Sequence, residues 1–154
     1  MKERLKIVSG GQTGVDRATL DAALEAGVPA GGWCPRGRLA EDGTIPERYP
    51  LKELKGGYLA RTERNVVDSD GTLIIHFGPL SGGTAHTLEF CQKHHKPCLL
   101  VDGGTTPPEE AVERVRRFIA ENGIGVLNVA GPRASGSRAA YPYTRRLIGL
   151  LLAG

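Results

Sequence analysis

The chain has 154 residues, with 20 lysines and arginines against 17 aspartates and glutamates, so its formal net charge is +3. A chain of this length can bury one substantial core, and because no linker-like stretch divides it, we expect residues 1–154 to form a single Rossmann-like ligand-binding domain. The mild charge contains no run of one sign and disfavours nucleic acid as a partner, and the lack of a signal-peptide pattern and of a roughly 20-residue apolar segment indicates a cytoplasmic protein without a membrane span.

Short apolar runs and helical patterns alternate along the chain. The apolar runs have strand length and cover residues 5–8, 31–34, 72–77, 98–101 and 126–129. Amphipathic patterns predict helices over 13–26, 58–69, 83–95 and 143–152, and one more opens at a capping box formed by Thr106 and Glu109. This alternation predicts an α/β fold, a Rossmann-like doubly wound parallel sheet flanked by helices.

The glycine-rich loops of the chain follow predicted strands. Ligands of doubly wound sheets lie at the carboxyl ends of the strands, so these loops are candidate binding loops. The segment 35–57 has no clear period and is rich in proline, glycine and charged residues, which predicts a long ordered loop or lid at the same edge of the sheet. Arg36 lies near its start and is a candidate ligand contact.

The first loop, SGGQTGVD, occupies residues 9–16. It contains no lysine, which disfavours the phosphate-binding loop of triphosphate hydrolases. It nearly matches the dinucleotide-binding fingerprint, with Gly11 and Gly14 correctly spaced and Ser9 in place of the first glycine. Gly10 and Gly11 allow a ligand to approach the backbone closely, and the N-terminus of the following helix can receive a phosphate.

Three polar side chains in this loop are candidate ligand contacts. Thr13 and Asp16 have the spacing of a capping box. A capping box and a ligand contact explain these two residues equally well. The Gln12 amide, at the tip of a glycine turn, is expected to contribute little to the stability of the fold. We therefore favour Gln12 as a ligand contact and leave both interpretations open for Thr13 and Asp16.

A second glycine loop, SGGTAHTLEF, covers residues 81–90. Gly82, Gly83 and Thr84 open a helix whose N-terminus can also receive an anion. His86 and Glu89 lie three residues apart on this helix, but a zinc site needs three or four protein ligands and the sequence offers no matching pair. We therefore expect no metal bound directly by the protein.

The third loop, NVAGPRASGS, covers residues 128–137 and follows the last predicted strand. Asn128 is a polar residue within that apolar strand. Gly131, Arg133 and Ser135 come next and place a guanidinium and a hydroxyl at the sheet edge, where both can bind a phosphate. Arg61, on the second predicted helix, faces either solvent or the cleft, and the sequence leaves this open.

No complete catalytic set is visible among these residues. The chain has no Ser-His-Asp order, no paired carboxylates and no activated cysteine. Cys34, Cys91 and Cys98 lack a CxxC spacing, which predicts buried or partly buried structural thiols. Glu89 and Asp16 would act as acid and base only if the protein were an enzyme. The residues themselves thus indicate a cleft for a small anionic ligand.

Five blocks of the chain resemble the molybdenum carrier family, a Rossmann-like group within the SLOG superfamily, which also includes the LOG nucleotide-processing and DprA DNA-processing proteins. The blocks are VSGGQTGVDRATLDAALEAG, GGWCPRGRLAEDGTIPERYPL, RTERNVVDSDGTLII, SGGTAHTLEF and LNVAGPRAS. The resemblance implies binding of molybdenum cofactor (molybdopterin), a phosphorylated pterin whose dithiolene sulfurs carry an oxo-metal. It also implies a homo-oligomer that stores this cofactor and hands it to a molybdoenzyme.

The LOG branch supplies the alternative to a non-catalytic carrier. Its pattern PGGxGTxxE contains a glutamate that serves hydrolysis of a nucleotide N-glycosidic bond. Gly82, Gly83 and Glu89 are in register with this pattern, whereas Ser81 replaces its proline and Ala85 its third glycine. Our first hypothesis is therefore a carrier, and the second is a nucleotide-binding enzyme of the LOG type with Glu89 as acid or base.

Overall fold

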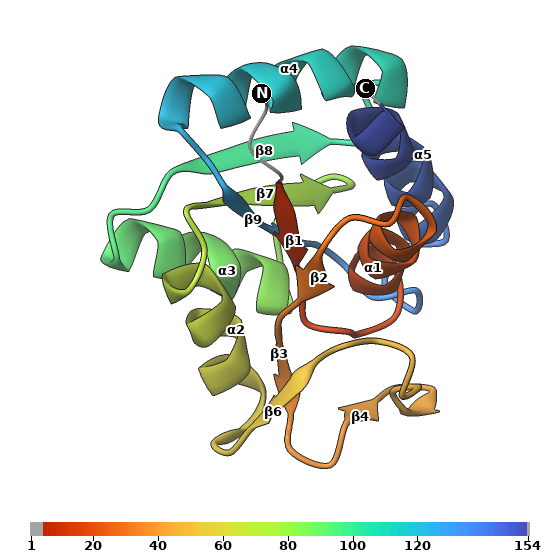
Figure 1. The fold of residues 1–154 in the computed structure, drawn as a ribbon, viewed down its shortest axis with the longest axis vertical. Helices are drawn as coiled ribbons and strands as arrows, with labels where there is room; N and C mark the ends of the chain where they lie inside the picture. The colour runs from red at the N-terminus through yellow and green to blue at the C-terminus, as the bar shows by residue number, and fades with distance from the viewer. Residues whose placement is uncertain (1–4, 154) are drawn as a thin grey trace.

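A parallel β-sheet forms the centre of the protein in the computed structural model, which describes residues 5–153 (Figure 1). Within these residues the sheet has five strands in the order β2-β1-β9-β7-β8, and every neighbouring pair is parallel. The strands are β1 (Lys6–Val8), β2 (Ala30–Gly31), β7 (Gly71–His76), β8 (Cys98–Asp102) and β9 (Val126–Ala130). The predicted Rossmann-like parallel sheet is confirmed.

The strand order places the last strand of the chain in the middle of the sheet. β9 lies between β1 and β7, with Ile7 opposite Leu127 and Leu73 opposite Val129. Counted from β9 as the first strand, the order across the sheet becomes 3-2-1-4-5, the order of a doubly wound dinucleotide-binding fold. The order reverses between β9 and β7, so the carboxyl ends of these two strands form the topological switch point.

Helices cover both faces of the sheet. α1 (Val15–Glu25), α4 (Pro108–Asn122) and α5 (Ala140–Ala153) pack together on one face, while α2 (Gly57–Val67) and α3 (Gly82–Lys93) pack together on the other (Figure 1). None of the helices within residues 5–153 combines the length and apolar character needed to cross a bilayer. The inward side chains of the strands and of the covering helices form the main core, including Ile7, Leu73, Ile75, Val101, Leu127 and Leu147.

The segment between β2 and α2 is an ordered excursion from the sheet, as predicted. β3 (Trp33–Pro35) pairs in parallel with β6 (Lys52–Leu54), and β4 (Leu39–Ala40) and β5 (Gly43–Thr44) form an antiparallel hairpin. The guanidinium of Arg38 donates hydrogen bonds to the carbonyl groups of four residues, Ile45, Pro46, Tyr49 and Leu51. This single side chain therefore fixes the path of the excursion around the base of the hairpin.

Several local predictions were wrong. The run 31–34 is divided between β2 and β3 at Gly32, which has φ 130° and lies so close to Ser9 that a Cβ would overlap the Ser9 carbonyl oxygen. The residue that caps α4 is Pro107, without a side-chain hydrogen bond, so Thr106 and Glu109 form no capping box. The last helix begins at Ala140, earlier than predicted, because the chain turns into it directly after 134–139.

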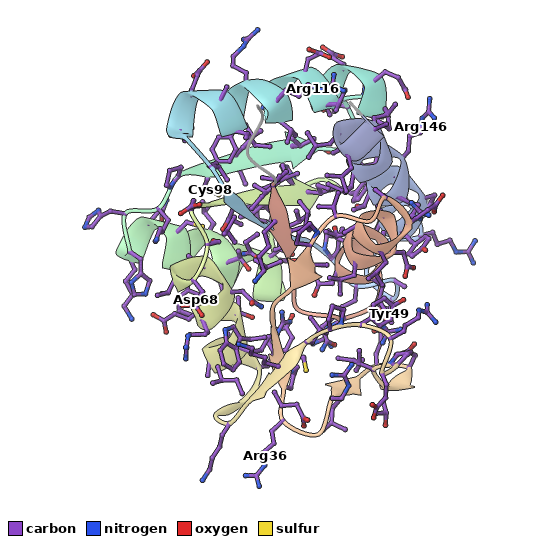
Figure 2. All side chains as sticks on the ribbon, viewed as in Figure 1. Arg36, Tyr49, Asp68, Cys98, Arg116 and Arg146 are labelled. Atoms are coloured by element: carbon purple, nitrogen blue, oxygen red, sulfur yellow. The ribbon has the colours of Figure 1, made fainter. Side chains whose placement is uncertain are left out.

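The three cysteines are buried or partly buried, as predicted. Cys34 and Cys91 are buried and Cys98 is partly buried, and all three are free. Figure 2 shows Cys98 where β8 begins, far from the loops that end β1 and β9. Nothing in their placement connects them with a ligand.

Candidate functional site

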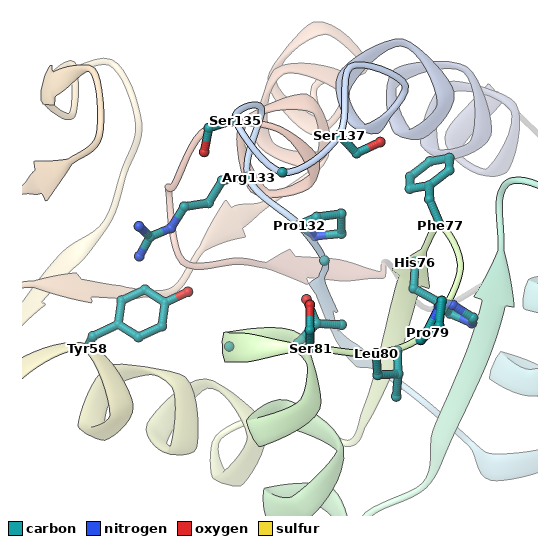
Figure 3. A pocket seen from close by; sticks show the side chains of 14 residues that line it. Tyr58, His76, Phe77, Pro79, Leu80, Ser81, Pro132, Arg133, Ser135 and Ser137 are labelled. Atoms are coloured by element: carbon teal, nitrogen blue, oxygen red, sulfur yellow. The ribbon is translucent and has the colours of Figure 1, made fainter.

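The first cavity lies at the switch point and is called the switch cavity below. It has a volume of about 400 Å³. Figure 3 shows that its walls come from the end of β7, the start of α3 and the loop after β9, with Tyr58 of α2 across from them. Its lining includes His76, Phe77, Gly83, Thr84, Gly131, Arg133, Ser135 and Tyr58. The cavity is therefore at the place where doubly wound folds bind ligands.

A second cavity, the hairpin cavity, lies between the β4–β5 hairpin and α2 and has a volume of about 600 Å³. It is lined by Gln12, Arg36, Leu39, Glu41, Tyr58 and Arg133, among others. Tyr58 and Arg133 line both cavities. The tyrosine ring and the guanidinium group thus form the partition between the two spaces.

A small inner cavity of about 20 Å³ lies beneath this partition. Most of its lining is polar and includes Asp16, Arg61, Thr62, Thr87 and Asn128. Gly83, Thr84 and Gly131 belong to both the inner and the switch cavity, so the two spaces share a wall. The site as a whole is a cleft with a polar floor.

Arg61 and Asp16 form a buried ion pair on this floor. Arg61 is 5% exposed and Asp16 is 4% exposed, and Arg61 Nη1 lies 3.7 Å from Asp16 Oδ2. Arg61 Nε is buried and has no hydrogen-bond partner among residues 5–153. Gly10 makes room for the pair, because a Cβ at this position would overlap the Arg61 guanidinium. α2 thus directs Arg61 toward the cleft, which answers the question that the sequence left open.

The electrostatics of the floor are dominated by burial. Asp16 Oδ2 accepts a hydrogen bond from the Gln12 N–H at 3.2 Å. Burial raises the pKa of the Asp16 carboxyl above its ordinary value of 3.8, and the Arg61 guanidinium and the Gln12 N–H counteract only part of that rise. Ionisation of the Asp16 carboxyl in the folded protein therefore costs free energy.

Two guanidinium groups contact the ring of Tyr58. Arg61 Cζ lies 4.3 Å and Arg133 Cζ 4.7 Å from the ring centroid. Both distances are within the range of cation–π attraction, which holds Arg133 at the mouth of the cleft. The Tyr58 hydroxyl lies next to Gly83, where an added Cβ would be 2.6 Å away. The tyrosine thereby ties the two arginines to the start of α3.

The hairpin is held over the cleft by polar contacts from two loops and from α1. Glu41 Oε2 accepts hydrogen bonds from the Thr13 hydroxyl and, at 3.2 Å, from the Ser135 N–H, and Glu41 Oε1 accepts one from the Ser135 hydroxyl. Arg17 donates two hydrogen bonds to Asp42, at 2.7 and 2.9 Å. These hydrogen bonds lower the pKa of the Glu41 and Asp42 carboxyls.

Ten of the fifteen binding residues predicted from the sequence line these cavities. They are Gly10, Gln12, Asp16, Arg36, Gly83, Thr84, Asn128, Gly131, Arg133 and Ser135. Two of them also have structural contacts, since the Asn128 amide donates to the Thr72 hydroxyl at 3.2 Å and the Gln12 amide donates to the Leu39 carbonyl at 3.0 Å. Figure 2 shows Arg36 extending outward from the excursion, so it lies at the rim.

The other five predicted residues lie outside the linings described above: Gly11, Thr13, Gly14, Gly82 and Glu89. Gly11 is close to Leu51, and Gly14 is close to the backbone of 132–134, so both positions require glycine for packing. The Glu89 side chain is 67% exposed and contacts His86 at 3.6 Å. Gly14 caps α1 without a side-chain bond, which removes the capping-box explanation for Thr13 and Asp16.

Sequence reasoning missed Tyr58, His76 and Glu41. A tyrosine after two glycines carries no sequence signal for cation–π contacts, which arise only because α2 packs beside the loop after β9. Glu41 lies in a segment without periodicity. His76 ends an apolar strand, and its Nδ1 is hydrogen-bonded to the Gly78 carbonyl at 2.7 Å.

A family model matches the chain, and its description agrees with the permuted strand order. Residues 7–152 match the circularly permutated YpsA SLOG family. The chain belongs to this family. The resemblance inferred from the five sequence blocks is thereby confirmed, and the strand order supplies its structural counterpart, with β9 in the place of a first strand.

A solved structure shows the same permuted SLOG fold. It is the crystal structure of "Putative molybdenum carrier protein" from Syntrophus aciditrophicus SB at 1.45 Å resolution. The two chains are 47% identical, with a TM-score of 0.94, and the similarity covers 97% of this chain and 96% of the Syntrophus protein. Among curated proteins, none matches the chain significantly.

Proposed function

We propose that this SLOG protein binds a small phosphorylated ligand in the cleft formed by the switch, hairpin and inner cavities, and holds it as a molybdenum cofactor carrier. The observation that carries the proposal is Arg61, a buried guanidinium whose Nε has no hydrogen-bond partner in the described part of the chain. A buried donor left unpaired costs about 1–3 kcal/mol. A ligand oxygen that reached this donor would remove that cost.

The surroundings of Arg61 favour an anionic ligand. Arg133 contacts the same tyrosine ring and lines both larger cavities. The N-terminus of α3, at Gly83 and Thr84, contributes the positive end of a helix dipole to the switch cavity. Guanidinium groups bind phosphate with two parallel hydrogen bonds, so Arg133 at the mouth and Arg61 on the floor suit a phosphorylated ligand.

The same residues fit a phosphorylated pterin. The Tyr58 ring offers an aromatic partition next to a heterocycle, and the polar floor offers donors and acceptors to its ring edge. Residues 5–153 contain no group of three His, Cys, Asp or Glu side chains that could hold a metal ion. We therefore propose that molybdenum would arrive as cargo, bound through the sulfur atoms of the pterin. The name of the Syntrophus protein points to the same cargo.

Anaerobic purification followed by analysis for molybdenum and pterin tests this function. We expect the wild-type protein to contain both, or to take both up from free molybdenum cofactor. Arg133→Ala should reduce the bound amount about tenfold, because it removes a charge-assisted contact to the phosphate. Arg138→Ala is the matched control, since Arg138 follows in the same loop and lines none of the three cavities.

Wild-type protein that takes up neither molybdenum nor pterin would contradict the carrier proposal. Equal loss of bound cofactor in the Arg133 and Arg138 variants would show that general charge, and not the cleft, holds the ligand. Arg61→Lys adds a second check, because lysine keeps the charge but lacks the planar donor set. We expect it to bind less cofactor than wild type while it still pairs with Asp16.

One observation favours the alternative that the protein is an enzyme. Asp16 is buried beside Arg61 with a raised pKa, which is typical of a general acid. Glu89, the glutamate in register with the LOG pattern, is instead exposed and outside the cleft. If nucleoside monophosphates released free base on incubation, we expect Asp16→Asn to abolish the reaction and Glu89→Gln to leave it unchanged. The reverse result would assign the chemistry to Glu89.

Other features of the proposed carrier follow from the length and composition of the chain and from the family resemblance. We propose one ligand-binding domain over residues 1–154, a homo-oligomer in the cytoplasm, and a molybdoenzyme as the recipient of the cofactor. Neither nucleic acid nor membrane is part of the proposal. Light scattering of the purified protein would give the oligomer size, and transfer of labelled molybdenum to an apo-molybdoenzyme would identify the recipient.

A further inference from the structure

The tip of the β4–β5 hairpin places a carboxylate on three hydrogen-bond donors. The Thr13 hydroxyl comes from the loop after β1, and the Ser135 N–H and hydroxyl come from the loop after β9. The Thr13 oxygen also accepts a hydrogen bond from the Ala134 N–H at 3.1 Å, which joins the two loops. Donors from two different loops thus converge on Glu41, at the edge of the sheet where the cavities open.

We propose that these Thr13 and Ser135 donors form an anion-binding site whose built-in occupant is the Glu41 carboxylate, and that an acidic group of the ligand displaces it. The inference rests on the proposed function, because it concerns the same cleft and names a second anionic group on the ligand as the competitor. A carboxylate and a phosphate accept hydrogen bonds from the same donors. Glu41 therefore occupies the site in the way such a ligand group would.

The position of Glu41 favours competition with the ligand. Glu41 and Arg133 line the hairpin cavity together, and Ser135 lines the switch cavity. A ligand whose phosphate contacts Arg133 is therefore next to the Glu41 carboxylate. Two like charges at one set of donors repel each other, so the ligand group and the Glu41 carboxylate compete for the Thr13 and Ser135 donors.

The hydrogen bonds of Glu41 to Thr13 and Ser135 can also be replaced at little cost in stability. Glu41 is exposed to solvent, and contacts of exposed charges contribute little net stability. The base of the hairpin is fixed separately by Arg38, which binds four carbonyl groups of the excursion. Displacement of Glu41 would thus loosen the tip, residues 39–44, which Arg17 and Gln12 still contact, and leave the excursion folded. Binding of the ligand would therefore loosen the hairpin that lies over the cleft.

The experiment uses the full chain with inorganic phosphate as the probe. Calorimetry gives the Kd of phosphate, and hydrogen exchange gives the protection of residues 39–44. We expect Glu41→Gln to bind phosphate about tenfold more tightly than wild type, because the competing charge is gone. Phosphate should raise exchange in the wild-type hairpin, and in Glu41→Gln exchange should be raised already without phosphate.

Asp42→Asn is the matched control. Asp42 neighbours Glu41 on the hairpin and pairs with Arg17, so its replacement also loosens the hairpin but leaves the Thr13 and Ser135 donors occupied. We expect its phosphate Kd to equal that of wild type. Equal or weaker phosphate binding by Glu41→Gln would overturn the inference, and so would equal tightening in both variants. Circular dichroism of each variant verifies that it is folded.

The outcomes separate this inference from the proposed function. If Glu41→Gln gains phosphate affinity while the protein takes up no pterin, the anion site stands and the carrier function fails. If the protein takes up cofactor but Glu41→Gln binds phosphate no better than wild type, the function stands and the built-in competitor is rejected.

Discussion

The guanidinium of Arg61 and the carboxylate of Asp16 lie 3.7 Å apart on the floor of the cleft, and both side chains are more than nine-tenths buried. The separation exceeds that of a direct hydrogen bond, and within the residues that the structure describes Arg61 Nε has no hydrogen-bond partner. The pair thus neutralises charge without saturating its hydrogen bonds. The floor of the cleft is accordingly polar, buried and incompletely satisfied among residues 5–153.

The first prediction concerns pH. Burial raises the pKa of the Asp16 carboxyl above 3.8, so its contribution to stability is fully present below the unfolded-state pKa and is lost as pH rises through the higher folded-state pKa. The free energy of unfolding of wild type should therefore fall over this window relative to Asp16→Asn, in which the contribution is absent. Urea unfolding at a series of pH values measures the difference. A carboxyl titration midpoint below 3.8 by NMR would show that Arg61 outweighs burial.

The second prediction concerns Gly10. A Cβ at this position would overlap the Arg61 guanidinium, so Gly10→Ala should displace that side chain and destabilise the protein by about 1–3 kcal/mol. It should also weaken phosphate binding. Gly149→Ala serves as the control, because Gly149 lies in α5 with no atom within 4 Å of the added Cβ. Thermal unfolding of both variants measures the contrast, and equal stabilities would contradict the packing argument.

The third prediction concerns Asn65, which joins α2 to the excursion. Its Oδ1 accepts the Trp33 N–H at 2.8 Å, and its Nδ2 donates to the Trp33 carbonyl at 3.0 Å. Asn65→Ala should cost about 2 kcal/mol, because a backbone donor and acceptor lose their partners. Fluorescence of Trp33, the one tryptophan of the chain, follows the unfolding.

The control for Asn65 is Asn122→Ala. Asn122 is exposed near the end of α4, where its amide donates to the Phe118 carbonyl within the same helix. We expect a change of no more than about 0.5 kcal/mol in its free energy of unfolding. If the two alanine variants unfold at the same denaturant concentration, the link between α2 and β3 does not stabilise the fold.

The fourth prediction concerns Tyr58. Tyr58→Leu removes the aromatic face that contacts Arg61 and Arg133, so Arg133 should lose its fixed position. We expect phosphate affinity to fall by about threefold to tenfold. Tyr58→Phe keeps the ring and should bind phosphate as wild type does. Equal loss in both variants would assign the effect to the hydroxyl and not to the ring.

The sequence predicts the architecture of this protein well because the longer sheet strands are mostly apolar. β7 and β9 fall within one residue of the runs at 72–77 and 126–129, and the loops that follow them carry most of the cleft. The strand order could not be predicted, since periodicity does not tell which strands pair. Only the structure shows that β9 lies beside β7 and that the switch point is between them.

The side-chain contacts of the cleft were less predictable. Thr13 and Asp16 have capping-box spacing, yet Thr13 contacts Glu41, 28 residues away, and Asp16 contacts Arg61. Both contacts depend on how α2 and the excursion fold back over the first loop. Glu89 shows the opposite case, because its register with a known pattern is clear while its side chain faces solvent. Local spacing therefore identifies the loops, and tertiary packing decides which of their side chains meet.

The central place of β9 also affects how the protein is made. β1 and β7 are joined only through β9, whose residues follow β1 by more than a hundred positions, and the mouth of the cleft needs Arg133 and Ser135. During synthesis, the segment up to β8 therefore has two sheet fragments with open inner edges and no complete cleft. Such edges pair readily with other chains, and contacts distant in sequence form slowly. A newly made chain can thus complete its cleft only after the last strand has taken its place between β1 and β7.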